Sequence, residues 1–446
     1  MTKEIRENKR ILKIFRITYI VLICVILSLI FITGNAIDSY MNKDKNKARN
    51  INDVVAQRLG KKIGKLTADD FKKIETIQIS KNICSNLKTL KKMTNLKSLS
   101  LNNPLDKTDN SPKLLKKVLG FLKISKSNRW KPYNFKPLIK LKQLESLQIY
   151  SYRLDNINHI GELKSLKSLN ISSSSQNQIK DISPLLKLTN LEYLAIGPIE
   201  MTEISSLAKL TNLKELRLTP FDTQPIDISF ITKLQNLHRL EISNCKINDI
   251  SPLGELANLE YLNIDGVRGY NDITPLSELT NLTSLIISSS SINDLSPVSK
   301  LDNLQHLAIR GHNANDISPL ANLTNLQFLL LNNASNIKDI SPLSQLNNLE
   351  QLIISDLQID NLSPLVELKE LQYLILSQAK LSNIDPLGDL NNLIFLYIQG
   401  TITNDISALK KLVNLKELKL YDNGNITIQQ KQELEKSMPE TKLYYN

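Results

Sequence analysis

Apolar residues along this chain recur with one period from about residue 74 to about residue 425. A leucine, most often preceded by Asn, opens each unit, and the step from one such leucine to the next is most often 22 residues. A unit this short cannot bury its own apolar side chains, so neighbouring units must stack on one another. The pattern therefore predicts one long repeat array, a solenoid. The repeated leucines are Leu96, Leu144, Leu166, Leu191, Leu213, Leu237, Leu259, Leu282, Leu304, Leu326, Leu349, Leu371, Leu393 and Leu415.

Each unit contains two short patterns. In Leu262–Ile264 the aliphatic side chains point inward and the residue between them points outward, which predicts a short strand. Asp-Ile-Ser-Pro-Leu follows at 181–185, 249–253, 316–320 and 339–343. Because proline favours the start of a helical turn and few residues remain before the next strand, this segment predicts a short 3₁₀ turn. We expect an α/β solenoid of about fifteen strands, parallel on the concave face, with 3₁₀ turns on the convex face.

The two ends of the array carry different patterns, which predict caps. Val54, Val55 and Leu59 mark a short amphipathic helix, and residues 67–71 resemble a capped turn leading into Ile74. We therefore assign a linker and helical cap to 38–73 and the repeats to 74–425. The C-terminal cap is assigned to 426–446. There Thr427 and Gln430 form a candidate capping box, and residues 442–445 can add a last strand.

The unit N-L-x-x-L-x-L…D-I-S-P-L-x-x-L resembles the repeat of bacterial internalin-type leucine-rich-repeat proteins. The resemblance implies a curved right-handed solenoid that binds a protein partner, typically on its concave sheet. The chain departs from the family where relatives often place a buried Asn ladder, three residues after the last strand aliphatic. The positions here are Ser174, Cys245, Ser290, Ala334, Ala379, Thr401 and Asn423, so we expect a weak ladder. A C-terminal cell-wall sorting signal, found in some relatives, is also missing, which assigns anchoring to the N-terminus.

The first forty residues contain a segment suited to a membrane. Residues 17–37 carry no charge, and 21 residues of helix rise about 31 Å, the thickness of a bilayer core. Residues 1–16 hold six Lys or Arg, so the positive-inside rule assigns them to the cytoplasm. We expect an uncleaved single-pass signal-anchor helix in the cell membrane, with the C-terminal domain outside the cytoplasm. The alternative is a signal peptide cleaved near Ala36.

Positive charge gathers in the first third of the chain, which has a net charge of +12 overall. An insertion near 104–136 lengthens one repeat and contains a basic amphipathic segment and the single Trp. We expect it to face anionic lipid or a cell-wall polymer. The alternative is that its apolar residues pack on the flank of the solenoid. The candidate residues are Lys113, Lys116, Lys117, Lys123, Lys126, Arg129 and Trp130.

The outward positions of the strands change character along the array. Through the middle they are polar and charged, as in Glu215, Arg217 and Thr219. In later units they become apolar and aromatic, and a continuous exposed patch of this kind usually marks an interaction site. We expect a protein partner there; self-association, or no ligand at all, is the alternative. The candidate residues are Phe328, Leu330, Ile353, Tyr373, Ile375, Phe395, Tyr397 and Tyr421.

No motif for catalysis stands out from the repeats. The sequence shows no nucleophile–base pair, phosphate loop or metal-ligand spacing, so we expect no enzyme activity, no metal and no cofactor. Nucleic-acid binding is not expected, because a membrane-facing surface accounts for the basic end. The sequence favours a membrane-anchored, extracytoplasmic leucine-rich-repeat protein that binds a protein through its concave face. Alternatives are a secreted adhesin-like effector after signal cleavage and a cytoplasmic regulatory scaffold.

Overall fold

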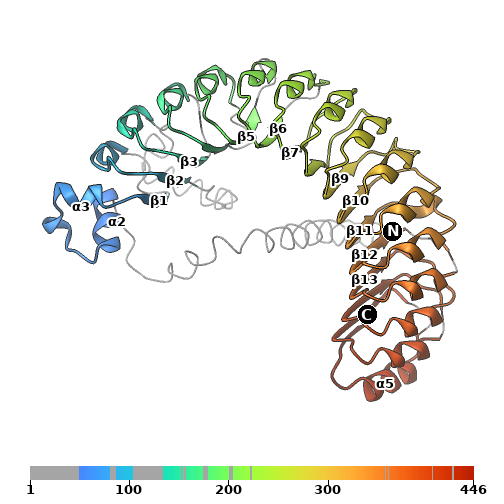
Figure 1. The fold of residues 1–446 in the computed structure, drawn as a ribbon. Coiled ribbons are helices and arrows are strands. Elements are labelled where there is room, and N and C mark those ends of the chain that lie inside the picture. Colours follow the sequence, from blue (N-terminus) through green and yellow to red (C-terminus); the bar gives the residue numbers. More distant parts are fainter. Residues whose placement is uncertain are drawn as a thin grey trace, which may run out of the picture. The chain divides into compact units, whose positions relative to one another are not determined.

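The repeat array and both caps are visible in the computed structural model of the chain (Figure 1). It describes residues 50–80, 87–103, 134–151, 154, 157–173, 179–199, 204–220, 224–356, 358–359, 361–403, 405–423 and 426–445. The predicted membrane segment 17–37 and most of the insertion 104–136 lie outside the described residues. Among those described, no helix has the length and apolar character needed to cross a membrane.

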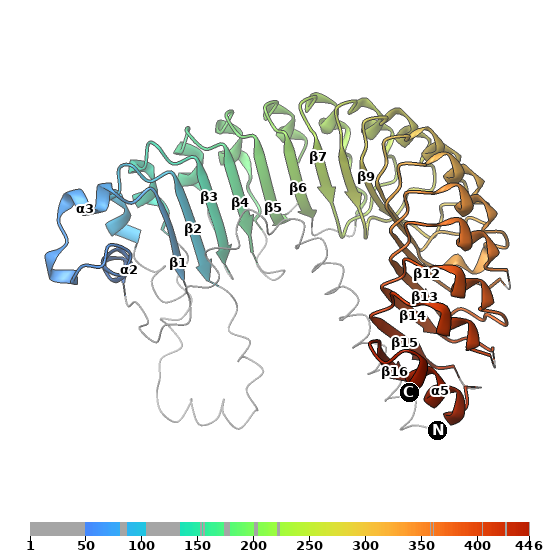
Figure 2. The same cartoon turned by 60° about the horizontal axis from the view of Figure 1, so that its bottom comes forward.

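One sheet of sixteen parallel strands runs through the described array, and each strand pairs with the next one in the sequence. The strands line the inner, concave side (Figure 2). The predicted solenoid with parallel strands is therefore confirmed. The strands are β1 Thr76–Ser80, β2 Ser98–Asn103, β3 Ser146–Ser151, β4 Ser168–Ser172, β5 Tyr193–Ile199, β6 Glu215–Pro220, β7 Arg239–Ile242, β8 Tyr261–Ile264, β9 Ser284–Ser288, β10 His306–Arg310, β11 Phe328–Leu331, β12 Gln351–Ser355, β13 Tyr373–Ser377, β14 Phe395–Gln399, β15 Glu417–Tyr421 and β16 Lys442–Tyr445.

Short 3₁₀ helices lie on the outer side and connect the strands (Figure 2). Six of the helices named below start on a Ser-Pro pair, which confirms the predicted turn. These helices are η3 Leu87–Lys92, η6 Lys136–Lys140, η7 Asn158–Glu162, η8 Ser183–Lys187, η9 Ile204–Lys209, η10 Ser229–Lys233, η11 Ser251–Glu255, η12 Thr274–Glu278, η13 Ser296–Lys300, η14 Ser318–Asn322, η16 Ser341–Gln345, η17 Ser363–Glu367, η18 Asp385–Asp389 and η19 Ser407–Lys411. A further short 3₁₀ helix, η15 Ala334–Asn336, follows β11 directly.

The aliphatic positions of the repeat build one continuous core between the strands and the outer turns. In β9, for example, Leu285 and Ile287 are fully buried, and Leu285 pairs with Leu262 and Leu307 on the neighbouring strands. The same alternation holds along the array, so each leucine packs on its counterpart in the next repeat. Burial of these side chains is the main stabilising term of the fold.

A row of Asn side chains ties most of the described repeats to the one before. The Asn that precedes the repeated leucine donates its side-chain N–H to a backbone carbonyl one repeat earlier, as from Asn258 to Gln235 at 3.0 Å. This bond satisfies a carbonyl that the tight turn leaves unpaired. The donors are Asn190, Asn212, Asn236, Asn258, Asn281, Asn303, Asn325, Asn348, Asn392 and Asn414.

The Asp that opens the turn is a second repeated feature. The backbone N–H of Ser341 donates to Asp339 Oδ1 at 2.8 Å, and the Ser341 hydroxyl donates to Asp339 Oδ2 at 2.7 Å. These bonds favour the charged carboxylate and lower the pKa of Asp339 below its ordinary 3.8, with the backbone bond as the larger cause. The pKa values of Asp249, Asp316 and Asp405 are lowered in the same way.

These Asp residues predict a loss of stability in acid. A lowered pKa in the folded state gives stabilisation that is complete above 3.8 and is lost as the pH falls below that value. We therefore expect the thermal midpoint to fall below about pH 4. The variant Asp316→Asn/Asp339→Asn keeps one acceptor oxygen in each turn, as Asn361 does in its own turn. Its thermal midpoint should therefore fall less steeply with decreasing pH. Thermal melts between about pH 5 and pH 3 test this; parallel curves for the two proteins would contradict it.

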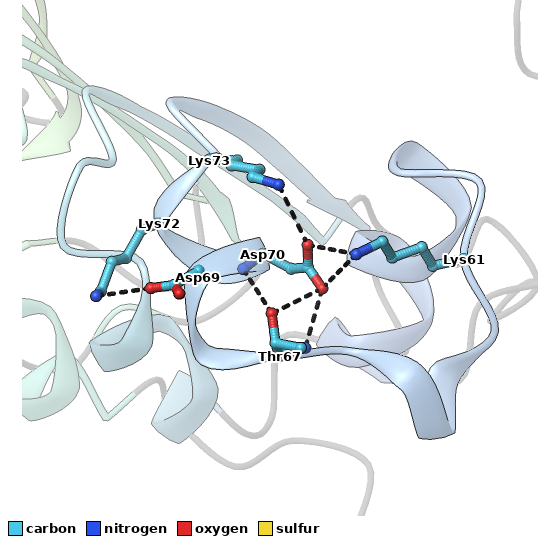
Figure 3. A network of polar contacts seen from close by, with 6 residues as sticks. All are labelled: Lys61, Thr67, Asp69, Asp70, Lys72 and Lys73. Atoms are coloured by element: carbon cyan, nitrogen blue, oxygen red, sulfur yellow. Dashed lines mark hydrogen bonds and ion pairs between the residues drawn. The ribbon is translucent and has the colours of Figure 1, made fainter.

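Two helices and a buried carboxylate cap the N-terminal end. The helices α2 Ile51–Arg58 and α3 Ala68–Lys72 confirm the predicted cap, and the short 3₁₀ helix η2 Ile63–Lys65 lies between them. Asp70 is buried, and Lys61 Nζ donates to its carboxylate at 2.7 Å (Figure 3). Thr67 completes a capping box with Asp70. The Lys61 bond, followed by the Thr67 backbone bond, holds the pKa of Asp70 well below its usual range, so the carboxylate stays charged.

The C-terminal cap also has the predicted form. Thr427 accepts from the backbone N–H of Gln430, and the Gln430 side chain accepts from the Thr427 N–H at 2.9 Å. This capping box starts α5 Ile428–Ser437, whose Leu434 is fully buried. After α5 the chain returns to the sheet as β16, the predicted last strand. The described array is thus closed by a helix at each end.

The predicted weakness of the Asn ladder is confirmed where the structure describes it. Cys245, Ala334 and Ala379 are buried at the ladder position, and only Thr401 and Asn423 are joined by a side-chain hydrogen bond, at 2.7 Å. Burial raises the pKa of the Cys245 thiol to about 12, so it stays protonated. The same column also holds Val267 and His312, which the sequence reasoning did not place there; burial lowers the pKa of His312.

Candidate functional site

Three rows of side chains cross the strands on the inner face, because each strand presents alternate residues there. We call them the first, middle and last rows. In the first row His306 lies beside Phe328, and Tyr373 lies beside Phe395. The middle row runs from Ala308 through Leu330, Ile353, Ile375 and Tyr397. The last row contains Arg310, Asn332, Ser355, Ser377, Gln399 and Tyr421.

The structure brings the eight predicted partner-binding residues together on strands β11–β15. Tyr373 is 42% exposed. Phe328, Ile375, Phe395, Tyr397 and Tyr421 are partly exposed. All of them lie on adjacent strands of the inner face, as the alternation predicted.

Two of the eight residues differ from the prediction. Leu330 has 0% and Ile353 has 8% of its surface exposed, so neither forms part of an exposed patch. Alternation along a strand indicates which way a side chain points but not how far its neighbours cover it. Both residues lie in the middle row, flanked by side chains of the two adjacent strands at about 4.8 Å and of the two outer rows. Their expected exposure was therefore wrong.

The exposed residues are arranged as pairs of rings. Tyr373 and Phe395 stack with ring centroids 6.2 Å apart, and Tyr397 meets Tyr421 edge-on at 5.7 Å. The Tyr397 hydroxyl donates to Gln399 Oε1 at 2.9 Å. Stacked and edge-on pairs hold their rings in place, so these side chains lose little further freedom when a partner binds.

The sequence reasoning missed two members of this surface, Lys419 and Tyr444. Lys419 Nζ lies 5.2 Å from the ring centre of Phe395 and 5.4 Å from that of Tyr444, which is 41% exposed. Lys419 also pairs with Glu417 at 2.7 Å. The signal was available, because extending the strand alternation into 442–445 places Tyr444 in the middle row. The patch therefore continues to the last strand of the sheet.

The inner face carries a cluster of charged side chains on β6 and β7. Arg217 pairs with Glu215 at 2.7 Å, and Arg239 pairs with Glu241 at 2.5 Å and with Glu215 at 3.1 Å. The Arg239 guanidinium also lies 3.3 Å from the ring centre of Tyr261. Two positive and two negative charges compensate one another here. The cluster is therefore an ordered polar region and not a site of net charge.

Comparison with known proteins identifies the repeat. A family model described as leucine-rich repeats (2 copies) matches residues 235–281, which contain strands β7 and β8 and the 3₁₀ helices η11 and η12. The chain is a leucine-rich-repeat protein. No curated protein matches the sequence.

Solved leucine-rich-repeat structures similar to the chain include two internalins of Listeria monocytogenes. The internalin InlF is 27% identical, with 75% of this chain and 89% of that chain covered and a TM-score of 0.49. The functional domain of InlJ is 19% identical, with 82% and 77% covered and a TM-score of 0.54. The predicted resemblance to internalin-type proteins is confirmed.

A plant leucine-rich-repeat protein shares the fold. The ectodomain of the receptor kinase GASSHO1/SCHENGEN3 from Arabidopsis thaliana is 18% identical, with 83% of this chain and 42% of that chain covered. Its TM-score is 0.53, and its structure was solved in complex with Casparian strip integrity factor 2. At this identity the likeness concerns the fold alone.

The other predictions for the leucine-rich-repeat protein concern a membrane- or wall-facing site, metal binding and enzyme activity. The seven predicted membrane- or wall-facing residues, Lys113 to Trp130, lie outside the described residues. Within the part of the chain that the structure describes, no group of three or more His, Cys, Asp or Glu could hold a metal ion. The expectation that the chain is not an enzyme stays a prediction.

Proposed function

We propose that the chain is a membrane-anchored, extracytoplasmic protein that binds a protein partner on the inner face of its later repeats. The leucine-rich-repeat fold is suited to protein–protein interaction, and its inner face is one continuous sheet of sixteen strands in the described array. The observation that carries the proposal is the run of ordered aromatic side chains from Phe328 to Tyr444, with Tyr373 and Tyr444 more than two-fifths exposed. Aromatic side chains of this kind dominate the binding energy of protein interfaces.

Two further observations support the proposal. The plant receptor ectodomain of the same fold was solved with a bound partner. In this chain, the uncharged segment 17–37 and the basic residues before it supply a signal-anchor pattern. The predicted contact of the 104–136 insertion with anionic lipid or a cell-wall polymer belongs to the same proposal, because it would place that insertion near the membrane.

Location is tested on intact cells that produce the full chain. If the repeats lie outside the cytoplasm, an added protease degrades them without lysis, and the mature chain retains the mass of residues 1–446. A mass that corresponds to a chain starting near residue 37 would show that the N-terminal segment is cleaved and that the protein is secreted. Protection from the protease until lysis would place the array in the cytoplasm.

The variant Tyr373→Ser/Tyr397→Ser tests the binding face. It removes one ring from each aromatic pair, and loss of two hot-spot aromatics typically costs at least about 2 kcal/mol, or about thirtyfold in affinity. We expect the variant to fold normally and to lose the partner that the unchanged protein retains in a pull-down. Tyr150→Ser is the matched control, because Tyr150 is an exposed tyrosine on the inner face of β3, far along the sheet. Equal capture by all three proteins would contradict the proposal.

A further inference from the structure

Two adjacent outer turns beside the N-terminal cap carry a group of exposed lysines. Residues 87–97 and 135–145 contain η3 and η6, which pack against each other, and they hold seven lysines and one acidic residue, Glu145. Lys97 pairs with Glu75, and Glu145 pairs with Lys167. The other six lysines are all exposed, and we call them the basic turn surface. They are Lys88, Lys91, Lys92, Lys136, Lys140 and Lys142.

Lysines at equivalent positions of a later turn have acidic partners. On η19, Lys410 pairs with Glu433 at 2.9 Å, and Lys411 pairs with Asp389 at 3.5 Å. Within the part of the chain that the structure describes, five members of the basic turn surface form no ion pair. These five are Lys91, Lys92, Lys136, Lys140 and Lys142. Unpaired like charges on adjacent turns repel one another, and an anionic partner would remove that repulsion.

The residue type favours a broad anionic surface over a single bound anion. All six side chains are lysines, which are point charges on flexible stems, whereas recognition of one phosphate group favours the fork of arginine. A bilayer with anionic lipid presents many phosphate groups in one plane, and each lysine close to it adds to binding. A convex surface with several exposed lysines on two adjacent turns fits such a plane.

The cap beside these turns adds an exposed apolar side chain. The helices α2 and α3 both pack on η3, and Lys92 Nζ lies 5.1 Å from the ring centre of Phe71 on α3. The short helix η2, which packs on α2, carries Ile63 with 52% of its surface exposed, close to the exposed Lys62 and Lys65. An aliphatic side chain beside lysines is typical of segments that lie in the interface of a bilayer.

We propose that the basic turn surface rests on a bilayer that contains anionic lipid. The inference rests on the proposed function, in which residues 17–37 anchor the chain, because only residues 38–49 separate that segment from the cap. It adds a described surface to the predicted contact of the 104–136 insertion. Because the 3₁₀ helices lie on the outer side of the array (Figure 2), this contact leaves the inner face of the later repeats open to the proposed protein partner.

Acetylation of lysines in the full chain, measured by mass spectrometry in lipid nanodiscs, tests the proposal. One set of discs is phosphatidylcholine alone, and the other contains about one-third phosphatidylglycerol. Only the uncharged amine is acetylated, and a surface potential of about −30 mV raises the local proton concentration about threefold. We therefore expect the six lysines of the basic turn surface to react about threefold more slowly in the anionic discs.

Lys410 and Lys411 serve as internal controls for this measurement. They lie on the last outer turn, and the surface potential falls off within about 10 Å of the bilayer. Their rates should therefore be equal in the two kinds of disc. Equal rates for the basic turn surface in both discs, or the same slowing at Lys410 and Lys411, would overturn the inference.

The triple variant Lys91→Gln/Lys92→Gln/Lys140→Gln removes half of the basic turn surface. Each lysine near an anionic bilayer contributes about fivefold to binding, so the three that remain should return to the rates found in phosphatidylcholine discs. Lys410→Gln/Lys411→Gln/Lys416→Gln is the matched control, because it changes the net charge equally at the other end of the array. Circular dichroism checks the fold of both. Persistent slowing in the first variant, or its loss in the control, would contradict the proposal.

Soluble polyphosphate separates a bilayer from other polyanions. It is added to the phosphatidylcholine discs at the phosphate concentration that the anionic discs supply. A bilayer partner predicts that the six lysines keep their fast rates. If polyphosphate slows them as much as the anionic lipid does, the surface accepts any polyanion and the assignment to a bilayer is wrong.

This inference and the proposed anchor can fail separately. If the chain stays with both kinds of disc and the lysine rates do not differ, the anchor stands and the basic turn surface has no role at the membrane. If the chain does not stay with phosphatidylcholine discs, the anchor fails. Capture by the anionic discs alone, lost in the first triple variant, would then still support the basic turn surface, and no capture would overturn it.

Discussion

Replacing Leu285 with alanine is expected to lower the free energy of unfolding by about 2–5 kcal/mol. Leu285 lies in the middle of the array, is fully buried, and packs between Leu262 and Leu307. Truncation removes three carbons from the core. The neighbouring leucines are held by strand pairing on both sides, so they cannot move inward to fill the cavity. The cost should therefore lie in the upper part of the range.

Urea unfolding followed by circular dichroism measures this effect. Val413→Ala is the control, because Val413 is 80% exposed and loses little by truncation. Since each repeat contacts only its neighbours, we also expect the weakened repeat to broaden the transition as the two halves of the array unfold less cooperatively. A urea midpoint equal to that of the control would show that neighbouring side chains move to fill the cavity.

Gly161→Ala is the second change with a large expected effect. A Cβ atom at Gly161 would lie 2.2 Å from the backbone oxygen of Pro184, in the next outer turn. A backbone oxygen held in a 3₁₀ turn cannot rotate away, so η7 and η8 must move apart. Overpacking of this kind costs about 1–3 kcal/mol. The loss should appear as a lower urea midpoint.

Gly64→Ala separates this clash from the general effect of replacing glycine. Nothing lies within 4 Å of a Cβ atom built at Gly64, and its backbone φ is not positive. Alanine there should leave the stability unchanged or raise it slightly, because it restricts the unfolded chain. If both variants unfold at the same urea concentration, the outer turns are looser than the structure indicates.

The repeat pattern was sufficient to predict the strands and the outer turns, and the capping boxes at the two ends were sufficient to predict the caps. Each depends on local chemistry within a short segment of the chain. Alternation in Leu262–Ile264 gives the strand, Ser251-Pro252 gives the turn, and Thr427 with Gln430 gives the last helix. Because the units stack in order, a correct unit also predicts the sheet and the order of its strands.

The exposure of individual side chains was less predictable. It depends on three neighbouring strands at once, which is why Leu330 and Ile353 were expected to be exposed and are buried. The alternation places Lys419 and Tyr444 in the middle row, but it does not show that the Lys419 ammonium lies against the rings of Phe395 and Tyr444. Local pattern predicts the direction of a side chain, and packing decides its surroundings.

The Asn bond to the preceding repeat has a consequence for how this molecule can change in length. Most described units carry one Asn donor for the turn of the preceding unit and one acceptor for the Asn of the following unit, as Asn258 and Asn281 show. When a whole unit is gained or lost, each Asn side chain still meets an equivalent carbonyl in the preceding unit. An insertion or deletion of part of a unit would leave the Asn donor and the carbonyl acceptor without partners. Genetic recombination between repeats can thus change the size of the inner surface by one repeat at a time without changing the fold.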